Sequence, residues 1–229
     1  MSSTRLPRKV LKDLAGAPML IQQLRRLARC TTLDEITVAT STATGDDPVV
    51  ETTEREGFRW FRGSETDVLA RYVGAAQEAR ADVVVRSTAD CPLIDPGTVD
   101  RVVGSLTPQW DYASNVVERS FPAGLDVEAL HLDTLVRTDR LATSAAAREH
   151  VTWFILREHP ELYRIRSVVD EENNSDLRWT VDEEADLELV RRIYGALDLA
   201  RVIRPYSEVI AYVRADASLV PTSKAAPAP

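Results

Sequence analysis

Cysteine is scarce in this sequence, and long apolar runs are missing. Cys30 and Cys91 are the only two cysteines, and their spacing matches neither a zinc motif nor a disulfide framework, so we expect a reducing, cytoplasmic setting. No apolar run approaches the ~20 residues that a membrane span requires, and the amino-terminal stretch lacks the apolar core of a secretory signal. We therefore expect no membrane association.

The sequence also lacks an excess of basic residues. Its formal net charge is -8 at pH 7, whereas a general nucleic-acid-binding protein needs a basic face to displace counterions from phosphates. We expect no nucleic-acid partner, although a few local cations would suffice to bind a small phosphorylated ligand. The 229 residues, 44% apolar and 28% charged, are enough for one large α/β domain with a sizeable core.

Short apolar strands alternate with helical patterns through the first half of the chain. Strands are predicted at 35–41, at 58–61 and around Val83–Val85, and helices after Pro18, at 47–57, at 65–80 and from Pro96, with Asp95 as its cap. This alternation predicts an α/β fold class, built from right-handed βαβ units on one twisted sheet.

After residue 110 the pattern changes. Gly124–His131 alternates apolar and acidic residues, which indicates a half-exposed strand in a mixed or antiparallel part of the sheet. Further strands are predicted at 112–115, 163–169 and 177–181, and helices at 132–141, at 145–158, from 183 and after 205. Residues 1–215 are predicted to form a single domain, and 216–229, rich in Ala, Pro, Ser and Thr, a disordered tail.

Asp90 follows the Val83–Val85 strand at its carboxyl end. Ligands of open α/β sheets bind just outside the carboxyl ends of the strands, so Asp90 is predicted to stand at the edge of a crevice, where it would hold a magnesium ion. The alternative is a turn aspartate that bonds its own backbone.

The amino-terminal segment combines small hydroxyl residues with Arg5, Arg8, Lys9 and Lys12. Short polar side chains let a backbone approach an anion closely and the cations neutralise it, so this segment is a candidate triphosphate-binding loop. A solvated basic amino terminus would have the same composition.

Eight motifs, taken together and in order, carry a family resemblance. They are Ser3–Pro7 with Lys9–Leu11, Ala39–Ser41, Phe61–Ser64, Asp67–Tyr72, Thr88–Asp95, Phe121–Pro122 with Gly124–Glu128, Arg148–Thr152 and Leu177–Asp182. In these motifs the chain resembles the spore-coat polysaccharide type of cytidylyltransferase, a group similar to the cytidylyltransferases that activate 3-deoxy-manno-octulosonate and sialic acid. The resemblance covers residues 2 to about 197.

The resemblance implies a Rossmann-like nucleotidyltransferase fold, with three α/β/α layers and a mostly parallel mixed sheet. It also implies Mg2+, CTP as co-substrate, and transfer of CMP to an acidic sugar or similar acidic acceptor, with release of pyrophosphate, for polysaccharide or natural-product biosynthesis. The implied catalytic residues are Arg5, Lys9 and Asp90, the nucleotide-binding residues Ser3, Arg5, Lys9 and Thr88, and the metal ligands Asp90 and Asp182. Region 111–165 would contact the acceptor and form a homodimer interface.

Acceptor-binding candidates are Asp126, Glu128, His150 and Arg178. Asp126 and Glu128 share one face of their strand and would line an acceptor pocket or face water. His150, next to Glu149, would contact the acceptor or lie on a surface. Arg86 and Arg178 precede the two proposed metal carboxylates, and either could bind an anionic acceptor or pair with an acid.

Two departures from the family pattern stand out. Arg8 replaces the glycine of a Pro-Gly-Lys motif, so the loop is expected to be altered rather than lost. The family's buried first strand has no counterpart before Met1, so we expect two interior strands to lack a neighbour, and we expect that the start has been assigned too late.

Two other functions share this fold. A nucleotidyltransferase could use another nucleotide, or a sugar phosphate or phosphonate acceptor. A nucleotide-binding scaffold would have lost catalysis altogether.

Overall fold

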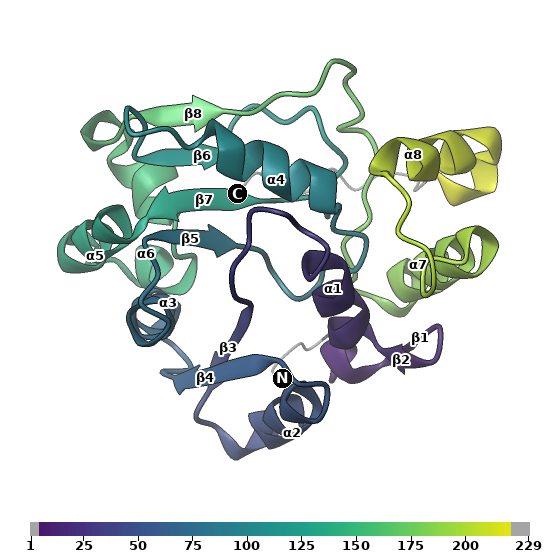
Figure 1. Cartoon of the computed structure of the whole chain (residues 1–229), viewed down its shortest axis with the longest axis horizontal. Coiled ribbons are helices and arrows are strands. Elements are labelled where there is room, and N and C mark those ends of the chain that lie inside the picture. Colours follow the sequence, from purple (N-terminus) through teal and green to yellow (C-terminus); the bar gives the residue numbers. More distant parts are fainter. Residues whose placement is uncertain (1–4, 221–229) are drawn as a thin grey trace.

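In the computed structural model, which describes residues 5–220, strands and helices alternate much as the hydrophobic pattern predicts (Figure 1). The strands are β1 (Asp13–Leu14), β2 (Ala17–Pro18), β3 (Thr37–Ser41), β4 (Arg59–Gly63), β5 (Val83–Arg86), β6 (Tyr112–Ser114), β7 (Glu128–His131) and β8 (Ile165–Ser167). The α-helices are α1 (Met19–Leu27), α2 (Asp47–Arg55), α3 (Val68–Glu78), α4 (Pro96–Ser105), α5 (Leu132–Leu141), α6 (Ala145–Glu149), α7 (Glu184–Leu197) and α8 (Tyr206–Ala215). Shorter helical turns include η1 (Lys9–Leu11), η3 (Phe154–Glu158) and η5 (Ala217–Leu219).

The β-structure of the described residues is divided, which corrects the prediction of one mostly parallel sheet. β3 pairs in parallel with β4, while a second sheet has the order β5-β7-β6-β8 (Figure 1). β7 runs antiparallel to both β5 and β6, and only β6 and β8 are parallel in that sheet. Within the described residues, β3 and β5 each have one edge without a strand partner.

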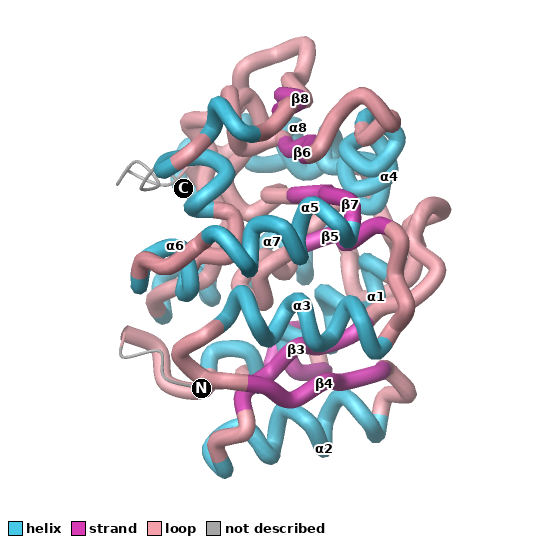
Figure 2. Tube along the Cα trace, turned by 90° about the vertical axis from the view of Figure 1, so that its left-hand side faces the viewer, coloured by secondary structure: helices cyan, strands magenta, loops and turns pink. Residues whose placement is uncertain are grey.

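Helices cover both faces of the larger sheet, so the fold has three layers. β7 shows why: Ala129 packs into a core with α1 and α4, whereas the next residue, Leu130, packs into a core with α3, α5 and α6, as the period-two geometry of a strand requires. β3 and β4 lie between α2 and α3 (Figure 2). The α/β class predicted from the sequence is confirmed.

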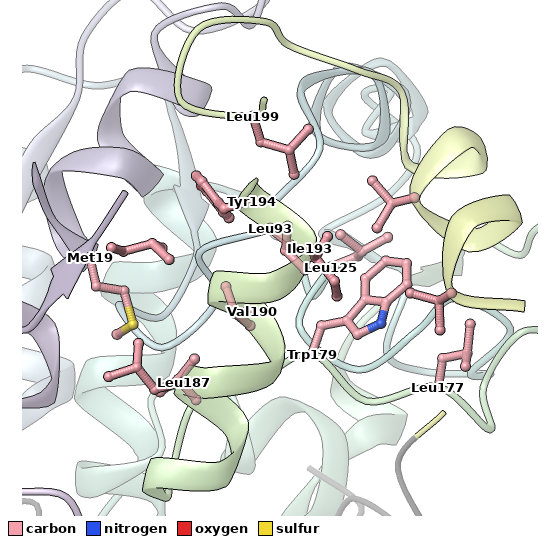
Figure 3. Close-up of a cluster of buried hydrophobic side chains, with 14 of the residues drawn as sticks. Met19, Leu93, Leu125, Leu177, Trp179, Leu187, Val190, Ile193, Tyr194 and Leu199 are labelled. Carbon is pink, nitrogen blue, oxygen red and sulfur yellow. The ribbon is translucent and has the colours of Figure 1, made fainter. Parts of the chain in front are cut away.

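A third core forms around α7 and α8 and fixes the segment that carries Asp182. Trp179, 1% exposed, packs with Val190 and Ile193 of α7 (Figure 3). Gly124 has φ +104°, and a Cβ there would lie 2.8 Å from the carbonyl carbon of Trp179, so a side chain would push this segment away. The predicted strand at 177–181 is wrong, because only Ala123 and Arg178 form a bridge there.

The predicted helix at 145–158 is interrupted. α6 ends at Glu149, Val151 has φ 49°, and a π-helical turn follows at Phe154–Glu158. Beside the break, the Thr152 hydroxyl donates to the buried carboxylate of Glu128 (2.6 Å). The segment after α6 is therefore fixed to β7 where a continuous helix was predicted.

Ordered structure continues past the predicted domain boundary at residue 215. Residues 217–219 form η5, and Leu219 is fully buried in the third core. The predicted tail is therefore wrong for residues 216–220, while 221–229 lie outside the described residues. Among the described helices, none combines the length and apolarity that crossing a bilayer would take.

Candidate functional site

Three residues far apart in the sequence, Lys9, Asp90 and Asp182, come together, with Lys9 in contact with both acids. The Lys9 ammonium donates to the carboxylates of Asp90 (3.1 Å) and Asp182 (2.9 Å) and to the Val181 carbonyl (2.8 Å). The side chains of Lys9, Asp90 and Asp182 are 16%, 26% and 23% exposed, so the cluster is partly shielded but open to a ligand. The convergence predicted for these residues is what the structure shows.

Backbone contacts hold the two carboxylates together. The Val181 N–H donates to the Asp90 carbonyl (2.9 Å), which aligns the segment after β5 with the segment before α7. The Asp186 carboxylate, in the first turn of α7, accepts from the backbone N–H groups of Asp182 and Glu183. Asp182 therefore stands at a capped helix start, where a carboxylate is stabilised.

Two neighbouring side chains orient these acids. The Thr88 hydroxyl donates to Asp90 (2.6 Å), so Thr88, predicted to bind nucleotide, orients this carboxylate. Arg5, 60% exposed, pairs with Asp182 (3.4 Å) and with Glu183 (3.6 Å). Ser3 lies outside the described residues.

Ion pairing shifts the pKa values of Lys9 and Asp182. Burial works against the charged form of Lys9, but the charges and hydrogen bonds of Asp90 and Asp182 outweigh it and raise the pKa of Lys9. Burial likewise works against the Asp182 carboxylate, but Lys9, Arg5 and Arg178 lower the pKa of Asp182. At neutral pH these shifts keep the Lys9 ammonium protonated and the Asp182 carboxylate ionised.

The η1 loop keeps its turn despite the departure from the family motif. Arg8 has φ 57°, a left-handed conformation that favours glycine. The 3-10 turn Lys9–Leu11 follows directly. The loop therefore forms a defined turn with Arg8 in place of glycine, and Arg8 adds a cation to it.

One cavity, of about 930 Å³, opens between this loop and the carboxyl end of β3. Its described lining includes Thr40 and Ser41, four basic residues, which are Arg8, Lys9, Arg71 and Arg148, and four acidic residues, which are Asp46, Glu65, Asp67 and Glu149. Sequence reasoning did not single out Arg71 or Arg148 as site residues, although both fall in motifs that carry the family resemblance. Arg148 also bonds Asp67, the cap of α3 (2.6 Å), so this wall of the cavity is rigid.

A second cavity, of about 430 Å³, is lined by residues of the segment just before Asp90, Arg86 to Thr88. Three predicted acceptor residues, Asp126, Glu128 and His150, line it together with Thr88 and Trp153. Glu128 is 4% exposed and accepts from Tyr112, Thr152 and Arg86, so its oxygens are occupied. Arg178 does not line this cavity and instead grips Asp182 and Asp186 (2.7 Å each).

The acidic pair suits a hard divalent cation. The Lys9 ammonium lies among three oxygens contributed by Asp90, Asp182 and Val181, so the donor set surrounds a positive charge. The described residues contain no cluster of three or more His, Cys, Asp or Glu side chains arranged to bind metal. Two carboxylates suffice for Mg2+, which keeps several waters and shares substrate phosphates.

The fold and the paired acids beside a basic loop define a nucleotidyltransferase-type protein. A family model described as cytidylyltransferase matches residues 1–199. The spore coat polysaccharide biosynthesis protein SpsF of Bacillus subtilis is 31% identical over 201 residues, covering 85% of this chain and 82% of that protein. This chain belongs to the cytidylyltransferase family.

Solved structures agree with this assignment. A cytidylyltransferase from Leptospira borgpetersenii superposes with a TM-score of 0.91 at 28% identity, covering 98% of this chain and 94% of that one. A CMP:2-keto-3-deoxy-manno-octonic acid synthetase complexed with CTP superposes with a TM-score of 0.65 at 20% identity, covering 86% and 95%. The second likeness concerns the fold alone, which is Rossmann-like.

Proposed function

We propose that this chain transfers CMP from CTP to an acidic sugar or similar acidic acceptor and releases pyrophosphate, with Mg2+ as cofactor, to supply polysaccharide or natural-product biosynthesis. The convergence of Asp90 and Asp182 on Lys9, which also lines the larger cavity, carries this proposal. We assign the larger cavity, where Arg8 and Lys9 are available to phosphate, to the triphosphate, and the smaller one, lined by Thr88 next to Asp90, to the acceptor.

The chemistry follows from positioning and charge. Attack of an acceptor oxygen on the α-phosphate forms one P–O bond and breaks the bond to pyrophosphate, so the site must align the reactants and neutralise the leaving group. Arg5 would grip phosphate with its planar fork, and Lys9 would supply a point charge. Asp90 and Asp182 would hold Mg2+, which neutralises phosphate charge when bound.

Pyrophosphate release from each of the four nucleoside triphosphates tests this proposal. The acceptors are a panel of keto-sugar acids, sugar phosphates and phosphonates, with Mg2+ present. We expect release with CTP and a keto-sugar acid, and loss of at least about 100-fold in turnover for Asp90→Asn. Release only with another nucleotide or a phosphorylated acceptor would contradict the proposed substrates, and no release with any pair would favour a nucleotide-binding scaffold.

We also propose a reducing, cytoplasmic setting, which the two free cysteines support. We further propose that the chain forms a homodimer through region 111–165. Leu141 and Leu162, 46% and 49% exposed, supply apolar surface in that region. Light scattering should give twice the monomer mass, whereas Leu162→Glu should shift the equilibrium to monomer.

A further inference from the structure

Two arginines precede the two acids of the site, and the structure separates their roles. Both terminal nitrogens of Arg178 are engaged, one by Asp182 and one by Asp186. Arg86, at the end of β5, instead lines the smaller cavity. Arg178 therefore organises the paired acids, and Arg86 is the arginine placed to meet an acceptor.

The Arg86 guanidinium has hydrogen-bonding capacity to spare. Its Nη1 donates to Glu128, while its Nε–H is buried without a hydrogen-bond partner in the described structure. The Tyr72 ring lies 5.9 Å from the guanidinium carbon. A buried donor without an acceptor is costly, so an incoming acceptor group that lets the guanidinium reorient would remove that cost.

Glu128 fixes the position of Arg86 by accepting from Nη1, and it leaves the other N–H donors of the guanidinium available. The carboxylate is almost fully buried and also accepts from Tyr112 and Thr152. The Glu128 carboxylate balances the charge of the Arg86 guanidinium through its Nη1 and holds that side chain against β7. This arrangement preorganises the planar fork, which matches a carboxylate better than a lysine ammonium would.

The rest of the cavity suits a polyhydroxylated molecule. Arg86 is the single lysine or arginine in the described lining, whose other polar members include Ser87, Thr88, Asp126 and Thr152. Trp153 adds an aromatic face. Thr88 also bonds Asp90, so a molecule held by Arg86 lies next to the proposed reaction centre.

We propose that Arg86 is the residue that recognises the carboxylate of the acceptor, and that it selects sugar acids over their uncharged analogues. This inference rests on the proposed function, because it assigns the smaller cavity to the acceptor. Arg86 binds the carboxylate through its free N–H donors, Glu128 positions the guanidinium, and the hydroxyl-bearing lining residues meet the sugar hydroxyls.

Calorimetric titration of two acids and their methyl esters tests this role. The probes are 3-deoxy-manno-octulosonate and N-acetylneuraminate, titrated into the full chain with CTP present and Mg2+ absent. We expect wild type to favour at least one acid over its ester by about 10-fold or more, and Arg86→Gln to abolish that preference while CTP affinity stays within about twofold. Arg86→Lys should recover only part of the preference, since it keeps the charge but loses the fork.

Two controls separate recognition from folding. Arg101→Gln removes an arginine that pairs with Asp170 outside both cavities and should leave the acid-to-ester ratio unchanged. If Arg86→Gln fails to fold because Glu128 is left unpaired, the double variant Arg86→Gln/Glu128→Gln removes both charges and is titrated instead.

The titration and the turnover assay test the role of Arg86 and the proposed CMP transfer separately. Equal binding of acid and ester by wild type, an unchanged ratio in the folded Arg86 variant, or no acid binding by wild type would overturn the inference. Absence of pyrophosphate release in the turnover assay would overturn the proposed transfer, even where acid binding depends on Arg86.

Discussion

At the scale of single residues, the Lys9 ammonium is the centre of the site. It lies within 3.1 Å of an oxygen from each of Asp90, Asp182 and Val181. An ammonium and a metal ion both seek such oxygens, so a cation held by the two acids would compete with Lys9 for them. Lys9 would then be released towards the triphosphate, which also requires a positive charge.

Lys9→Met should raise the affinity of the nucleotide-free protein for Mn2+ about tenfold, because it frees two carboxylates from an ammonium. Free Mn2+ measured by electron paramagnetic resonance reports this affinity. Lys12→Met is the matched control, since Lys12 lies in the same segment but pairs with Glu184 (3.1 Å). An equal gain in both variants would show that Lys9 does not occupy the cation position.

At the scale of elements, α4 begins where its sequence predicts, and its cap also fastens a distant helix. The Asp95 carboxylate accepts from the Thr98 N–H (2.8 Å) and from the N–H of Tyr206, at the start of α8 (3.1 Å). One buried side chain therefore joins the segment after Asp90 to the carboxyl-terminal part of the fold.

Asp95→Ala should lower the free energy of unfolding by about 2 to 4 kcal/mol, because it removes the helix cap and leaves buried N–H groups without an acceptor. Urea denaturation at pH 7 measures the change. Asp34→Ala, at an exposed position, should change stability by less than about 0.5 kcal/mol. If the two variants are equally stable, Asp95 does not join these helices.

Local sequence patterns predict where helices and strands form better than they predict which distant residues come into contact. Periodicity identified α3, α5 and α7, and the Asp95–Pro96 pair located the start of α4, because these signals lie within a few residues of one another. The break at Val151 is accompanied by a contact between Thr152 and Glu128, 24 residues apart. Such a contact cannot be read from local periodicity.

In the candidate site too, local sequence predicts some residues, while the roles of others depend on contacts between distant segments. Asp90 and Asp182 are predictable because each ends an apolar segment and falls in a recognisable motif. Sequence alone left Arg86 and Arg178 equivalent, since each precedes one of these acids by four residues. Only the folded chain shows that Asp186 engages Arg178 while Arg86 faces a cavity.

At the scale of the whole molecule, ion pairs between arginine and aspartate connect distant segments. Arg164 lowers the pKa of Asp111, and Arg214 lowers the pKa of Asp176. For Asp67 burial opposes the charged form, but Arg148 outweighs it and again lowers the pKa. The protein is therefore stabilised by carboxylates that ionise more readily folded than unfolded.

Because folding lowers the pKa values of these carboxylates, we expect the protein to lose stability in acid. Carboxylates with depressed folded-state pKa values contribute fully above the unfolded value of about 3.9 and lose that contribution as the pH falls towards the folded value. Calorimetry should show a nearly constant Tm from pH 7 to about 5 and a steep fall below about 4. Asp111→Asn should make the acid limb shallower, and a flat Tm down to pH 3 would contradict this electrostatic contribution.

The most direct test of the shared cation site is a crystal structure of the full chain with CTP and Mn2+, in which anomalous scattering locates the metal. We predict a peak bonded to carboxylate oxygens of both Asp90 and Asp182, with the Lys9 ammonium displaced towards the triphosphate. A peak bonded to neither acid, with Lys9 still between them, would contradict that site and the proposed chemistry that depends on it.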